Sequence, residues 1–95
     1  MTPEGKIKSM INKVLAKHGV WVFMPVPSGF QATSIDYFCC YKGRFITIEA
    51  KAPGKKPTSR QEYVLGLIRE HGGHTFVVDG DDALHYMDEV LKEMK

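Results

Sequence analysis

Two strand-like segments joined only by Lys42-Gly43 constrain the fold of this chain more than any other feature. Residues 34–41 and 44–51 are rich in β-branched and aromatic side chains, which is typical of β-strands. A two-residue connection that contains glycine predicts a tight hairpin, in which Tyr41 pairs with Arg44. Every other cross-strand pair then follows by counting away from the turn.

Counting from the turn brings two acids together. Asp36 is predicted to lie directly opposite Glu49, with Cβ atoms about 4.5–5.5 Å apart on one face of the hairpin. Lys51 comes two residues after Glu49 and shares that face, where it lies opposite Ser34. Two carboxylates this close repel each other unless a proton or a cation lies between them. Mg²⁺ would resolve the repulsion, since it typically takes one or two carboxylates and keeps several waters.

Two other arrangements remain open at this point. The two acids could lie on a solvated face, where Lys51 neutralises one of them and no chemistry follows. Alternatively, a three-residue turn with a bulge would slide the pairing and move Asp36 away from Glu49.

The other segments predict three helices and two more strands. Thr2-Pro3-Glu4 is typical of a helix start, and His18-Gly19 of a helix end. Glu4 lies on or beside the apolar stripe of that helix, which is unusual for an acid. The whole series is expected at 3–18 (helix), 20–26 (buried strand), 34–41 and 44–51 (hairpin), 59–70 (helix), 74–78 (strand) and 83–94 (amphipathic helix with acids on its outer face). The order α-β-β-β-α-β-α predicts an α/β chain of the α+β type with a mixed sheet, in a single domain over residues 1–95.

Basic and acidic residues are unevenly distributed along the chain. The first sixty residues carry a net charge of +7 and only three acids, Glu4, Asp36 and Glu49, whereas the remaining residues carry −5. A basic half indicates a polyanionic partner. The three acids inside it are candidates for a site that binds a cation.

Several other classes of protein do not fit. No apolar run approaches the ~18 residues of a membrane helix and no signal-peptide pattern is present, so we expect a cytoplasmic protein. Cys39 and Cys40 are adjacent and would point to opposite faces of a strand, which argues against a disulfide. The histidines have no partners at zinc-binding spacing.

Asp36, followed by Glu49-Ala50-Lys51 at the end of the next strand, is similar to the metal-binding signature of the PD-(D/E)XK nuclease superfamily. The core of that superfamily has the same α-β-β-β-α-β order. Within it the chain most resembles the virus-type replication-repair nuclease (VRR-NUC) family, and the resemblance covers nearly the whole chain. The residues that carry it are Asp36, residues 48–55 (Ile-Glu-Ala-Lys-Ala-Pro-Gly-Lys), Pro57, Arg60, Gln61 and Gly72-Gly73 before the strand Thr75 to Asp79. Ile35 stands where the family has a proline.

The resemblance implies a restriction-endonuclease-like core and metal-dependent hydrolysis of DNA. Asp36 and Glu49 would bind Mg²⁺ or Mn²⁺, with the backbone carbonyl of Ala50 as a further ligand. Lys51 would position the attacking water or stabilise the transition state.

The resemblance also implies that Glu4 and Gln61 act near this site. The residues themselves leave simpler roles open for both. Glu4 could favour the helix dipole only, and Gln61, which is predicted to face inward, could be an ordinary polar residue in the first turn of a helix.

Basic side chains of the first helix and of the loop before the second helix are candidates for contacts with the DNA backbone. Such contacts are independent of sequence and sensitive to salt. These residues are Lys6, Lys8, Lys13, Lys17, Lys55, Lys56 and Arg60. Phe30, in the loop between strands, could stack on a base or anchor the core.

The stand-alone members of the family resemble Holliday-junction resolvases, which implies a homodimer that cuts branched DNA in replication, recombination or repair, in a bacterial or phage-infected cell. A domain of 95 residues buries a modest core, and a second subunit would add stability and binding surface. Two alternatives stay open: a non-selective nickase or exonuclease with the same chemistry, and a non-catalytic nucleic-acid-binding module.

Overall fold

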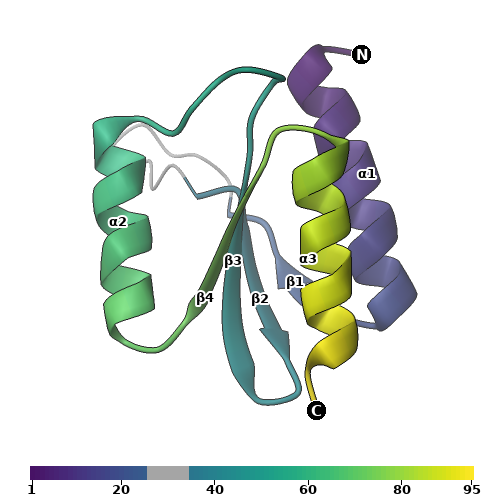
Figure 1. Ribbon diagram of the computed structural model, residues 1–95, viewed down its shortest axis with the longest axis vertical. Coiled ribbons are helices and arrows are strands. Elements are labelled where there is room, and N and C mark those ends of the chain that lie inside the picture. The colour runs from purple at the N-terminus through teal and green to yellow at the C-terminus, as the bar shows by residue number, and fades with distance from the viewer. Residues whose placement is uncertain (26–34) are drawn as a thin grey trace.

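The chain folds into three layers, with a four-stranded sheet between helices (Figure 1). A computed structural model describes residues 1–25 and 35–95. Helices α1 and α3 lie side by side on one face of the sheet, and α2 lies on the other (Figure 1). The elements are α1 (Pro3–His18), β1 (Trp21–Phe23), β2 (Tyr37–Tyr41), β3 (Arg44–Ala50), α2 (Ser59–Glu70), β4 (His74–Val78) and α3 (Asp81–Glu93).

The sheet has the order β1-β2-β3-β4 and is mixed. The first three strands are antiparallel, and β4 pairs with β3 in parallel. Helix α2 makes the crossover between β3 and β4, because parallel neighbours need a long connection. The predicted α+β class, the mixed sheet and the order α-β-β-β-α-β-α are confirmed.

The hairpin turn has the geometry that its sequence predicts. Lys42 and Gly43 have φ angles of 51° and 78°, and two positive φ angles are the requirement of a type I′ turn. Tyr41 pairs with Arg44, and the ladder runs without a bulge to Tyr37 opposite Ile48. The counted register is confirmed, and the alternative turn with a shifted register is wrong.

The hydrophobic core lies between the sheet and the pair α1 and α3. Each helix contributes one buried stripe, and the strands contribute the side chains that point to this face. The most buried members are Ile7, Ile11 and Leu15 from α1, Tyr37, Cys39, Ile46, Ile48, Ala50 and Val78 from the sheet, and Met87 and Leu91 from α3. Because side chains alternate along a strand, Glu49 points to the opposite face from Ile48 and Ala50.

The prediction of a buried strand over residues 20–26 is wrong in two respects. Strand β1 ends at Phe23, and it lies at the edge of the sheet with Trp21 and Phe23 largely exposed. An apolar run predicts a strand, but it does not reveal that the described helices leave Trp21 and Phe23 exposed. The predicted start of the hairpin at Ser34 lies outside the described residues, and so does Phe30.

Helices α1 and α3 are joined by a charged cluster. Asp88 of α3 lies 2.6 Å from Nε2 of His18 and 2.8 Å from Nζ of Lys17. The prediction that the acids of α3 occupy its outer face is therefore wrong for Asp88. Lys17 pairs with this acid, and its contact with DNA stays a prediction.

The same cluster predicts how the fold responds to acid. Hydrogen bonds from Lys17 and His18 lower the pKa of Asp88 from 3.8 to about 2. A lowered folded-state pKa gives stability that is present above the unfolded-state value and is lost as the pH falls toward 2. Asp88→Asn should therefore cost about 1 kcal/mol of unfolding free energy at pH 5, and the difference should shrink between pH 4 and pH 2.

Urea denaturation followed by circular dichroism measures this difference. Asp82→Asn, which removes an exposed acid from the first turn of the same helix, is the control. A constant difference between wild type and Asp88→Asn across this pH range would contradict the assignment.

Among the described residues, no helix is long and apolar enough to cross a lipid bilayer.

Candidate functional site

Side chains from three elements meet beyond the last pair of the hairpin. Asp36 comes directly before β2, Glu49 lies in β3 and Lys51 follows it, and Glu4 and Lys8 come from the first turns of α1. The Glu49 carboxyl group lies close enough to three of these side chains for their charges to shift its pKa: Asp36 and Glu4 raise it, and Lys51 lowers it. The structure therefore brings together the three acids of the basic half of the chain.

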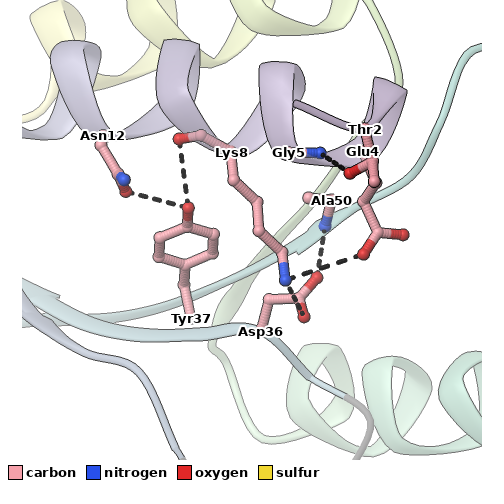
Figure 2. Close-up of polar contacts among 8 residues, drawn as sticks. All are labelled: Thr2, Glu4, Gly5, Lys8, Asn12, Asp36, Tyr37 and Ala50. Carbon is pink, nitrogen blue, oxygen red and sulfur yellow. Dashed lines mark hydrogen bonds and ion pairs between the residues drawn. The ribbon is translucent and has the colours of Figure 1, made fainter.

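Asp36 is held in place from two sides (Figure 2). One carboxylate oxygen, Oδ2, accepts a hydrogen bond of 2.8 Å from the backbone N–H of Ala50. The other, Oδ1, lies 3.4 Å from Nζ of Lys8. The last backbone pair of β2 and β3 is Tyr37 opposite Ile48. The contact between Asp36 and the Ala50 amide extends the pairing of these two strands by one step and fixes where the carboxylate lies.

Glu49 is a buried acid with an incomplete set of partners. The residue is 2% exposed, and its Oε2 is buried without a hydrogen-bond partner in the described part of the chain. Burial, and then a hydrogen bond to Asp36 and the charge of that neighbour, raise the pKa of Glu49 to about 9, although Lys51 acts in the opposite direction. The charge of Asp36 therefore opposes ionisation of Glu49, and a pKa of about 9 favours the protonated carboxyl group at neutral pH.

Lys8 joins the acids from the side of α1, which the sequence alone did not reveal. Its Nζ lies between Asp36 and Glu4, at 3.4 Å and 3.7 Å from their carboxylate oxygens (Figure 2). The sequence grouped this lysine with the surface residues that could contact DNA. The spacing of Glu4 and Lys8, four residues apart on one helix, was the available signal for their pairing.

Tyr37 is a second residue whose role near the site was missed. It is fully buried, and its hydroxyl lies 2.9 Å from Oδ1 of Asn12 and 3.3 Å from the carbonyl oxygen of Lys8 (Figure 2). Burial, with a smaller effect from the Asp36 charge, raises the pKa of the Tyr37 hydroxyl to about 12, so it stays protonated and donates. These contacts fix α1 against β2 directly beside Asp36.

Gln61 faces inward as predicted and is 6% exposed. Its Oε1 accepts a hydrogen bond of 2.9 Å from the backbone N–H of Thr58, and the backbone N–H of Gln61 donates to Oγ1 of Thr58. Together these form a capping box at the start of α2. The structure gives Gln61 this structural role, and its participation in catalysis stays a prediction.

The predicted DNA-contacting residues lie on the surface, several of them near the site. The loop 51–58 leaves β3 at the end of the sheet where α1 begins (Figure 1). Lys55 and Lys56 in this loop are exposed, and so is Arg60, whose guanidinium group lies 5.9 Å from the ring centre of Tyr63. Lys13 is exposed farther along α1, and Lys6 lines a groove of about 420 Å³ with residues that include Pro53 and Asp81.

The acids of the site are the ligands available to the metal that the sequence predicts. Residues 1–25 and 35–95 contain no group of three or more His, Cys, Asp or Glu side chains placed to hold one ion. They do contain the pair of Asp36 and Glu49, in which one buried carboxylate oxygen has no partner. Two carboxylates are a set that Mg²⁺ accepts, since waters or substrate oxygens complete its coordination. The residues fit a two-carboxylate site, and the carbonyl of Ala50 as a further ligand stays a prediction.

No known protein-family model matches this chain, and no curated protein shows significant sequence similarity to it.

Proposed function

We propose that this protein is a metal-dependent DNA endonuclease of the VRR-NUC type. The observation that carries the proposal is the pair of Asp36 and Glu49, whose carboxyl groups meet at the end of the hairpin. A buried carboxyl oxygen that has no partner among the described residues is costly, and a cation that occupies the site during function would explain why Glu49 stands there. Lys51, directly after β3, is a basic side chain that can stabilise charge on a phosphodiester.

Each residue has a defined part in this reaction. Asp36 and Glu49 would hold Mg²⁺ or Mn²⁺, which would lower the pKa of a water molecule and neutralise charge on the scissile phosphate. The N–H of Ala50 orients the Asp36 carboxylate. Lys51 stabilises negative charge that develops on the phosphate or positions the attacking water.

The surroundings of the pair support a nucleic acid as substrate. The exposed side chains of Lys55, Lys56 and Arg60 lie in the loop that leaves β3 and in the first turn of α2. Contacts of lysine and arginine with phosphates read the shape of DNA and not its sequence. The motif resemblance favours branched DNA and a homodimer, in which two sites cut opposed strands.

The proposal is tested by incubating the purified protein with a four-way junction, a flap, a linear duplex and a single strand. Mg²⁺ or Mn²⁺ should support cleavage of the junction, and a chelator should abolish it. Equal cleavage of all four substrates would favour a non-selective nickase or exonuclease. Intact DNA in every reaction would reject the nuclease and favour a non-catalytic binding module, in which Lys8 permanently neutralises the acids.

A further inference from the structure

Lys8 contacts two acids of the site, unlike a lysine that only extends from α1 into solvent. Its ammonium group bridges carboxylates from two elements, Glu4 in its own helix and Asp36 at the start of β2. Figure 2 shows the ammonium group reaching both carboxylates, and on Asp36 it contacts Oδ1 whereas the Ala50 amide donates to Oδ2. Lys8 therefore supplies positive charge to the same carboxylate that the proposed metal would use.

The backbone of Lys8 is fixed, whereas its side chain is free to leave. The Tyr37 hydroxyl lies 3.3 Å from the Lys8 carbonyl, which holds this turn of α1 against β2. The Lys8 side chain is 33% exposed, and its four-carbon stem can rotate toward solvent without any change in the fold. The ammonium group can thus be exchanged for another cation at little structural cost.

A lysine ammonium and a divalent ion compete at a shared carboxylate. Two cations a few ångströms apart repel each other strongly, even where solvent screens the interaction. Lys8 must either move away or weaken the binding of the metal. In both cases its charge subtracts from the apparent affinity of the site.

We propose that Lys8 is a built-in counter-ion that neutralises Asp36 and Glu4 in the metal-free protein and is displaced when a divalent cation binds. This inference rests on the proposed function, because it assumes that Asp36 and Glu49 bind a metal. Lys8 then controls the affinity of the site for metal and does not contact DNA in the metal-free state.

The test is the affinity of the 95-residue chain for Mn²⁺ without DNA, measured by isothermal titration calorimetry. Lys8→Met should bind Mn²⁺ at least fivefold more tightly than wild type, because the competing charge is gone. Lys8→Arg keeps the charge and should bind within twofold of wild type. Lys92→Met removes the same charge from an exposed ion pair on α3 and should also leave the affinity unchanged.

Thermal unfolding supplies a second measurement on the same proteins. Without metal, Lys8→Met should melt about 2–4 °C below wild type, because it leaves Asp36 and Glu4 without their cation. Saturating Mn²⁺ should then raise its melting temperature by more than it raises that of wild type, since tighter binding stabilises the folded state more.

The outcomes separate this inference from the proposed function. If wild type binds Mn²⁺ and Lys8→Met binds it no more tightly, Lys8 does not compete with the metal and only the present inference is overturned. If Lys8→Arg binds as tightly as Lys8→Met, the charge is not the cause, and the inference is again overturned. If neither wild type nor any variant binds Mn²⁺, the metal site itself is absent and both proposals are overturned.

Discussion

Asp36→Asn is expected to lower the rate of metal-dependent DNA cleavage by about 10²–10³-fold and to leave the fold intact. The amide oxygen of asparagine still accepts the hydrogen bond from Ala50, so the end of the hairpin keeps its geometry. The negative charge that would hold the cation is lost. The rate is measured under single-turnover conditions with Mg²⁺, and the fold is checked by circular dichroism.

Two further variants make this result specific. Asp82→Asn removes an exposed acid from the first turn of α3 and should cut DNA at the wild-type rate. Lys51→Ala keeps both carboxylates, so it should lose cleavage while it retains Mn²⁺ binding. Cleavage by Asp36→Asn at the rate of Asp82→Asn would exclude Asp36 from the active site.

Glu49→Gln is expected to raise the free energy of unfolding of the metal-free protein by about 2 kcal/mol at pH 7, although it should also abolish metal-dependent cleavage. Glutamine is similar in shape to the protonated glutamate and can donate a hydrogen bond to Asp36. It also removes the cost of keeping an ionisable group buried beside another acid. Stability and function would thus change in opposite directions at one position.

The pH dependence of this gain has a defined sign. The folded-state pKa of Glu49, about 9, lies above the value of 4.5 that is usual for the unfolded chain. Between these values the folded protein holds a proton that the unfolded chain has lost, so the stability of wild type falls as the pH rises. The advantage of Glu49→Gln should therefore be small near pH 4.5 and grow toward pH 8.

Urea denaturation in the presence of a chelator measures the advantage at each pH. Glu70→Gln, at an exposed position at the end of α2, is the matched control and should change stability by less than about 0.5 kcal/mol. A loss of stability in Glu49→Gln at pH 7 would mean that the buried carboxylate is ionised and well paired, and it would contradict a raised pKa for Glu49.

The sequence predicted most of the fold because its local signals agree with one another. The connection Lys42-Gly43 accepts two positive φ angles, and this sets the register of the hairpin without any knowledge of tertiary contacts. The register in turn predicted that Asp36 and Glu49 meet. The caps at Thr2 and Gly19 similarly set the bounds of α1.

The contributions of Lys8 and Tyr37 could not be predicted because they depend on how α1 docks on the sheet. Helical periodicity shows which face of a helix is buried, but not where the helix lies along a strand. Lys8 reaches Asp36 only because α1 crosses the sheet at the start of β2 (Figure 2). The exposure of β1 has the same origin, since it depends on which part of the sheet the helices leave open.

The exposed edge strand also determines what fluorescence can report about this protein. Trp21 is the only tryptophan of the chain, and it is 64% exposed on β1. An indole that already contacts water in the folded state changes its surroundings little when the core melts. Intrinsic emission therefore reports on the sheet edge and on anything that covers it, such as a second subunit, whereas global unfolding is better followed through the helices.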